Sequence, residues 1–216
     1  MLVNHSYIGQ NGKQNTVFPF EFMYLTQGEL TTGTQTSHNG SYAMDFQGMY
    51  NVSTRRLRCP YYAPVDLTLV AIADANAHSY VYTSDNEVNF VDGTSGYFTI
   101  LVAHDNTSYS VGRKVKQGFE LGRTGTYGIH TGDHVHIEVK KGQYEGCHTN
   151  SDGVYMLTNS THLYDLIGVD DTVLLVDGGY NWREFGDTPI PPTPTSRRNK
   201  FPWVLYARNI RQRNVK

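Results

Sequence analysis

The stretch HVHIEV at residues 134–139 alternates polar and apolar side chains at every step. This period of two predicts a β-strand with one face in a hydrophobic core. His134 and His136 stand two residues apart, so both imidazoles point to the same side of the strand. Such a pair can bind or flank a metal ion, or it can be two partly exposed strand histidines.

Other segments also read as short strands. Four share an apolar or alternating pattern with β-branched and aromatic residues: residues 67–73 (LTLVAIA), 79–83 (SYVYT), 97–102 (YFTILV) and 172–176 (TVLLV). Gly, Asn and Asp clusters separate them. This spacing predicts a mostly β chain built on an antiparallel sheet or barrel-like domain. Within the β-rich part of the chain, only residues 160–168 suggest a helix, with Ser160 or Thr161 as the N-cap.

The composition agrees with a β-rich globular chain. The 216 residues suffice for one sizeable core, or for one domain plus a tail. Hydrophobic residues make up 38% and charged residues 18%, below the averages of about 45–50% and 25%. Abundant Gly and Tyr replace the Ala, Leu, Glu and Lys that a helical bundle or coiled coil requires. We expect no membrane span and no secretion signal, and we expect Cys59 and Cys147 to be free thiols.

Charge divides the chain near its C-terminal end. Residues 197–216 hold seven of the 18 basic residues and no acidic residue, whereas the rest carries 11 basic and 20 acidic residues. A proline-rich stretch at residues 188–196 is expected to form a stiff linker. We therefore predict a body at residues 1–187, this linker, and a short basic C-terminal arm at residues 197–216 in which a helix can form.

Two further polar groups can complete a metal site with the histidine pair. His38 lies in a turn-like segment (SHNG, residues 37–40), and Asp45 follows in YAMDF at residues 42–46. Two imidazoles and one carboxylate leave the fourth position of a catalytic zinc open for water. His104 ends the segment LVAH, where a nearby imidazole could act as a general base or stabilise an oxyanion.

Taken in order, these segments resemble the lysostaphin-type, or LytM-like, zinc peptidoglycan endopeptidases. The hallmarks of that family are a His-x-x-x-Asp pair, a histidine in a Tyr-Ala-His-like segment, and a His-x-His strand after a Gly-Thr-Gly loop. The counterparts here are residues 37–46 (SHNGSYAMDF), 64–71 (PVDLTLVA), 101–104 (LVAH), 111–125 (VGRKVKQGFELGRTG) and 131–139 (TGDHVHIEV). The resemblance covers about residues 18–140 and implies a lysostaphin-type peptidase domain.

The resemblance also implies roles for individual residues. His38, Asp45 and His136 would bind Zn²⁺, while His104 and His134 would act as general base and as stabiliser of the tetrahedral intermediate, in an order that stays open. Six residues separate His38 from Asp45, where three are common in the family, and this longer spacing resembles phage-encoded members.

Several residues remain as alternatives or are expected to play no part in the chemistry. Asp66 and Asp92 are rivals of Asp45 as the carboxylate ligand, and Tyr24 is the nearest counterpart of a family tyrosine upstream of the first ligand. Tyr127 could line a groove beside the Gly-rich loop at residues 122–132. The remaining histidines are expected to be ordinary surface or partly packed residues, namely His5, His78, His130, His148 and His162.

The implied activity is hydrolysis of peptide bonds in the cross-bridges or stem peptides of bacterial peptidoglycan. A phage-encoded enzyme without a signal peptide would act from the virion tail or after release to the host cell wall. The basic arm could bind anionic wall polymers, virion tail proteins or nucleic acid. Two other hypotheses stay open, namely a catalytically silent virion tail or wall-binding module, and a zinc hydrolase acting on a soluble peptide.

Overall fold

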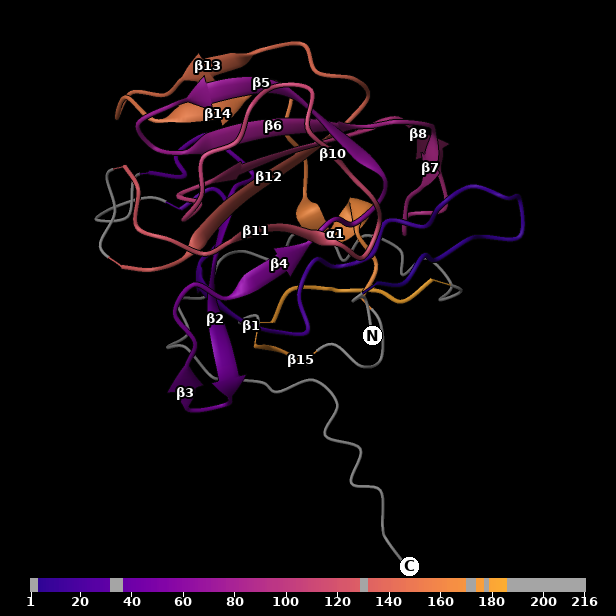
Figure 1. The fold of residues 1–216 in the computed structure, drawn as a ribbon, viewed down its shortest axis with the longest axis horizontal. Helices are drawn as coiled ribbons and strands as arrows, with labels where there is room; N and C mark the ends of the chain where they lie inside the picture. Colours follow the sequence, from indigo (N-terminus) through magenta and orange to yellow (C-terminus); the bar gives the residue numbers. More distant parts are fainter. Residues whose placement is uncertain (1–3, 32–36, 129–131, 170–173, 177–178, 186–216) are drawn as a thin grey trace, which may run out of the picture.

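A nine-stranded sheet forms the framework of the protein (Figure 1). The computed structural model describes residues 4–31, 37–128, 132–169, 174–176 and 179–185. The strands run in the order β10–β5–β6–β9–β12–β2–β1–β15, and β3 pairs with β2. Every pairing in this sheet is antiparallel except that of β1 with β15, which confirms the expected mostly β, antiparallel fold.

The large sheet consists of β1 (Phe22–Gln27), β2 (Met44–Asn51), β3 (Thr54–Arg55), β5 (Leu67–Asp74), β6 (Ser79–Ser84), β9 (Phe98–Ala103), β10 (Lys114–Val115), β12 (Val135–Lys141) and β15 (Leu174–Val176). Three two-stranded pairs accompany it: β4 (Pro60–Tyr62) with β11 (Glu120–Arg123), β7 (Val88–Asn89) with β8 (Ser95–Gly96), and β13 (Cys147–Thr149) with β14 (Tyr155–Leu157).

The predicted strands coincide with observed ones. β5, β6, β9 and β12 fall on the four segments expected within residues 67–139, and β15 covers the described part of residues 172–176. The predicted helix is a single turn, α1 (Leu163–Leu166), and the expected cap is wrong. The N-cap is His162, whose side chain makes no capping hydrogen bond. Thr161 pairs with β12 instead, where its backbone N–H donates to the Val139 carbonyl at 2.8 Å.

The alternation in β12 divides the sheet into two different faces. Val135, Ile137 and Val139 are fully buried in the main hydrophobic core, together with aromatic side chains such as Phe46 and Tyr61. The opposite face carries the polar residues of β12 beside a small apolar cluster of Val81, Leu101, Ala103 and Leu157. The pair β13–β14 supplies Leu157 to that cluster, so this hairpin packs on the polar face of β12.

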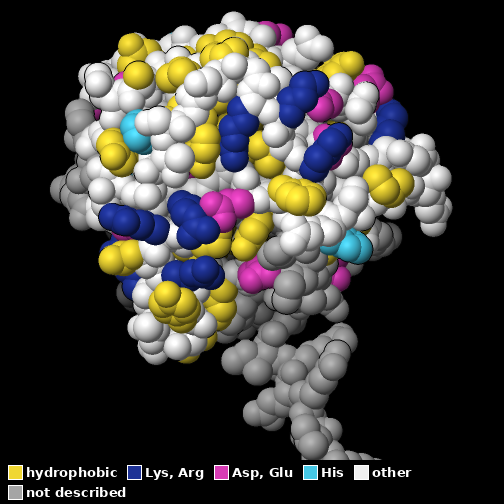
Figure 2. Space-filling view, viewed as in Figure 1, with side chains coloured by type: hydrophobic (Ala, Val, Ile, Leu, Met, Phe, Trp, Pro, Cys, Tyr) yellow, Lys and Arg dark blue, Asp and Glu magenta, His cyan; other side chains and the backbone are white. Residues whose placement is uncertain are grey.

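Some expectations about the chain as a whole can be compared with the described residues. Cys59 and Cys147 are free thiols, as predicted. Among these residues, no helix is long and apolar enough to span a bilayer. On the face seen in Figure 2, basic and acidic side chains are interspersed. The proline-rich linker, the basic arm and its expected helix lie outside the described residues, so the boundaries at residues 187 and 196 stay predictions.

Replacing Ile137 tests whether β12 holds the main core together. We expect Ile137→Ala to lower the free energy of unfolding by about 2–5 kcal/mol, because it removes fully buried methyl groups and leaves a cavity. The same substitution at Ile72, which is 41% exposed on β5, should cost less than about 1 kcal/mol. Urea denaturation of both variants gives the comparison, and equal losses would contradict this assignment of the core.

Candidate metal centre

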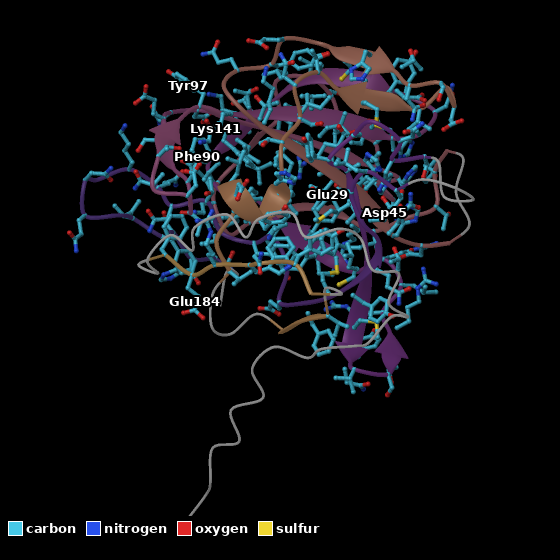
Figure 3. All side chains as sticks on the ribbon, turned by 180° about the vertical axis from the view of Figure 1, so that it is seen from behind. Glu29, Asp45, Phe90, Tyr97, Lys141 and Glu184 are labelled. Atoms are coloured by element: carbon cyan, nitrogen blue, oxygen red, sulfur yellow. The ribbon has the colours of Figure 1, made fainter. Side chains whose placement is uncertain are left out.

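The pairing of β2 with β12 brings two of the predicted ligands together. His136 lies directly opposite Asp45 in the antiparallel register, although 91 positions separate them in sequence. Directly opposed residues project from the same face of a sheet, so both side chains lie on the polar face. Figure 3 labels Asp45 on β2. His136 Nδ1 stands 3.1 Å from Asp45 Oδ1, and both residues are buried.

His38 reaches the same point from a loop. Its Nδ1 hydrogen-bonds to the Gly28 carbonyl at 2.8 Å, just after the end of β1, and its Nε2 stands 3.1 Å from Asp45 Oδ1. The turn is closed by the Ser41 N–H, which donates to the His38 carbonyl. The ring is completely buried. His38 and Asp45 can therefore meet at one point although they are seven positions apart in sequence. The hydrogen bond to Gly28 anchors the His38 loop to the end of β1, whereas Asp45 lies on β2.

The hydrogen bonds fix which ring nitrogens can bind a cation. A carbonyl oxygen only accepts, so Nδ1 of His38 carries the proton and Nε2 presents a lone pair toward Asp45. In His136 the roles are reversed: Nε2 lies 3.0 Å from Glu138 Oε1 and donates to this carboxylate, so Nδ1 faces Asp45.

These atoms fit a zinc ion. The three ligand atoms, one from each of His38, Asp45 and His136, lie within 4.8 Å of one another. The two separations of 3.1 Å are close to the distance of about 3.3 Å between ligands of tetrahedral zinc. Two ring lone pairs and a carboxylate oxygen would repel one another when buried, unless a cation or protons lie between them. The Glu138 carboxylate behind His136 is a typical orienting partner of a metal-binding imidazole.

The electrostatics of the group favour positive charge between the two carboxylates. Burial alone would raise the pKa of the Asp45 carboxyl, but His38 and His136 hold that pKa well below its usual range. Burial disfavours a charged His136 ring, yet hydrogen bonds and attraction from Asp45 and Glu138 outweigh it and raise the pKa of His136 to about 10. The two carboxylates therefore attract positive charge to this ring.

The two predicted catalytic histidines lie beside the ligands. His134 Nδ1–H donates to the Gly132 carbonyl at 2.7 Å, and its Nε2 is 3.6 Å from Asp45 Oδ2. His104 directly follows β9, and its Nδ1–H donates to the Tyr127 carbonyl at 2.5 Å. The ring centroids of His104 and His134 are 4.6 Å apart. Burial, with the neighbouring His134 and His136 rings, lowers the pKa of His104 to about 3 and keeps it neutral.

The rival and auxiliary residues lie elsewhere. Asp66 accepts hydrogen bonds from Lys116, Gln14 and the Gln117 backbone, and Asp92 binds Lys141 and Thr94. Neither belongs to the group of three that can hold an ion. Tyr24 lies on β1 opposite Gln47, two positions along β2 from Asp45. His130 lies outside the described residues.

Glu138 is a further residue of the site that the motifs did not predict. This residue is fully buried, and its second oxygen accepts the Leu157 N–H at 3.0 Å, which ties β14 to the histidine strand. A signal was present in the strand pattern, because Glu138 stands two positions after His136 and must share its face. His162, expected to be ordinary, forms an ion pair with Glu29 at 2.7 Å if it is protonated.

The chain has relatives among known proteins by sequence, and it shares partial likenesses with several solved structures. No family model matches the chain. Morphogenesis protein 1 of Bacillus phage B103 is 37% identical over 177 residues, which are 81% of this chain but 46% of that protein. The chain thus corresponds to about half the length of this relative.

The solved structures have lower sequence identity to this chain than the phage relative has. A zinc-containing peptidase from Vibrio cholerae is 14% identical at a TM-score of 0.40, covering 63% of this chain and 43% of that one. The catalytic domain of lysostaphin from Staphylococcus simulans is 20% identical at a TM-score of 0.37, covering 55% and 78%. The catalytic domain of a prophage-encoded M23 protein from Enterococcus faecalis is 19% identical at a TM-score of 0.39, covering 60% and 89%.

Zinc binding should release a proton from His136. The raised pKa predicts a doubly protonated ring near neutral pH when no metal is present, and zinc at Nδ1 must displace one of these protons. Titration calorimetry in two buffers of different ionisation enthalpy should give about one proton released per zinc bound. His148→Ala, which alters an exposed histidine on β13, should leave this value unchanged. A release of zero would contradict the protonated ring.

Proposed function

We propose that this chain is a zinc-dependent endopeptidase that hydrolyses peptide bonds in the cross-bridges or stem peptides of bacterial peptidoglycan. The supporting observation is the convergence of His38 Nε2, His136 Nδ1 and Asp45 Oδ1 in a buried site whose hydrogen bonds turn ring lone pairs inward. Three protein ligands leave a tetrahedral ion with one position for water or substrate, which is typical of catalytic rather than structural zinc.

His104 and His134 give this site its proton-transfer groups. When bound, zinc would act as a Lewis acid toward a peptide carbonyl and would acidify a water molecule. Because Nδ1–H of each ring donates to a backbone carbonyl, the neutral rings carry their lone pairs on Nε2. A lone pair there suits a general base, and the same atom becomes a donor to an oxyanion once it has accepted a proton. Each imidazole could therefore serve as general base or as oxyanion stabiliser without rotating its ring.

Peptidoglycan is the proposed substrate because of the ordered motif resemblance, from the segment at residues 37–46 to the strand at residues 134–139. The relative from Bacillus phage B103 supports a phage origin, and its name associates it with morphogenesis. Action from the virion tail, or after release to the host cell wall, is consistent with both. The basic arm at residues 197–216 would then bind anionic wall polymers or neighbouring tail proteins.

The metal assignment predicts one zinc per chain. Elemental mass spectrometry of the purified protein should find one equivalent, and His38→Ala should lose it, because two remaining ligands cannot hold the ion tightly. His148→Ala, altering an exposed histidine outside the site, should retain zinc. If the wild-type protein takes up no zinc on incubation, the endopeptidase proposal is refuted. The silent wall-binding module would then be the favoured hypothesis.

The catalytic assignment predicts a separation between metal binding and turnover. His104→Ala and His134→Ala should retain one zinc and yet release new amino groups from purified cell walls about 10²–10⁴-fold more slowly, because each removes a proton-transfer group. EDTA should abolish the wild-type activity, and added zinc should restore it. Full activity in both histidine variants would contradict the roles assigned here.

The substrate assay also separates the remaining hypotheses. A protein that binds walls and zinc without releasing amino groups would be a silent module. One that cleaves free peptides but not walls would be a different zinc hydrolase.

A further inference from the structure

His78 lies outside the proposed metal site but is built into its support. It occupies the turn between β5 and β6, where its backbone has a left-handed φ of 44°. Its imidazole stacks on the Tyr127 ring, with centroids 3.7 Å apart and planes 11° from parallel. Tyr127 belongs to the Gly-rich loop that precedes the histidine strand, so this stack joins two segments distant in sequence.

Both nitrogens of His78 are also held. Nδ1–H donates to the Asp105 carbonyl at 2.8 Å, and Nε2 lies 3.3 Å from Ser108 Oγ, which must donate because Nδ1 carries the proton. Rotating the ring would break two hydrogen bonds and the aromatic stack together. The side chain is therefore a rigid block between the Gly-rich loop and the segment that follows β9.

Two partners of His78, namely Tyr127 and Asp105, are also joined to His104. Tyr127 supplies the carbonyl that accepts His104 Nδ1–H, and Asp105 is the next residue in the chain. The His104 backbone N–H donates to the Ala77 carbonyl at 2.9 Å, so the same turn also holds the main chain. His104 has a left-handed φ of 69°, a conformation that non-glycine residues adopt only when their surroundings enforce it.

Close packing leaves this arrangement little freedom. Gly128, next to Tyr127, has φ of +87°, and a Cβ there would stand 2.8 Å from the Ala77 Cβ. On the far side, the buried Asp105 carboxylate accepts hydrogen bonds from the Thr107 and Arg123 backbone N–H groups and from the Tyr61 hydroxyl. Close packing at Gly128 thus restricts the loop that carries Tyr127, and the hydrogen bonds of Asp105 restrict the residue that accepts His78 Nδ1–H.

We propose that His78 is a positioning residue for His104. By stacking on Tyr127 and binding the Asp105 carbonyl, it fixes the acceptor that keeps the proton of His104 on Nδ1 and the lone pair on Nε2. Without the stack, the Tyr127 carbonyl can move, and the alternative tautomer would present an N–H where a base needs a lone pair. The consequence for turnover rests on the proposed function, whereas the effect on the His104 ring does not.

The test follows the His104 ring directly in the full-length, zinc-loaded protein. Long-range ¹H–¹⁵N correlation spectra report which ring nitrogen is protonated, and His104→Gln identifies the signals. Wild-type His104 should appear as the Nδ1–H form, and His78→Ala should populate the Nε2–H form. His78→Phe keeps an aromatic ring on Tyr127, so its tautomer ratio at His104 should remain closer to that of the wild type. The control variant His148→Ala should show the wild-type tautomer.

Activity gives the second measurement. On purified cell walls, His78→Ala should lower kcat about 10- to 100-fold with zinc content unchanged, the range typical of residues that orient a reactive group. Wild-type tautomer and kcat in His78→Ala would overturn the proposal, as would equal losses in His78→Phe and His78→Ala. If no variant, wild type included, cleaves walls, a tautomer change in His78→Ala still supports the positioning role while the proposed function fails.

Discussion

The antiparallel register between β2 and β12 determines the rest of the polar site. It places Asp45 directly across from His136 and leaves both on the face opposite the main core. A slip of one residue would turn His134, His136 and Glu138 into that core and expose Val135, Ile137 and Val139. The hydrophobic side of β12 therefore specifies the chemical side, because burying one set of residues forces the other set to meet Asp45.

The backbone then sets the chemical state of each imidazole. His38, His104 and His134 all donate Nδ1–H to carbonyls, of Gly28, Tyr127 and Gly132 respectively. His136 alone is held through Nε2, by a carboxylate. This difference allows rings that arrive from a loop, from the end of a strand and from a strand interior to direct lone pairs into one small volume. The geometry depends as much on these acceptors as on the histidines themselves.

Local patterns predicted the parts of this structure that depend on local rules. The alternation in residues 134–139 and 79–83 identified β12 and β6, and the apolar run at residues 67–73 identified β5. The predicted helix cap was wrong because Thr161 pairs with Val139. Local sequence propensities carry no information about such a contact between distant segments. His78 was missed for the same reason: its importance comes from Tyr127 and Asp105, which folding brings to it. Glu138 was accessible through strand parity, since a residue two positions from a candidate ligand shares its face.

The cluster of buried charge has a consequence for the metal-free protein. His38, Asp45, His136 and Glu138 are all buried, and β12 places the last two opposite Ala103 and Leu101 of the small apolar cluster. Burying carboxylates is unfavourable unless positive charge and hydrogen bonds compensate for it. A proton on His136 compensates in part, but a divalent cation would compensate more fully while relieving the repulsion between lone pairs. The zinc ion proposed for catalysis would therefore also stabilise the folded state, because it would bind the folded protein and not the unfolded chain.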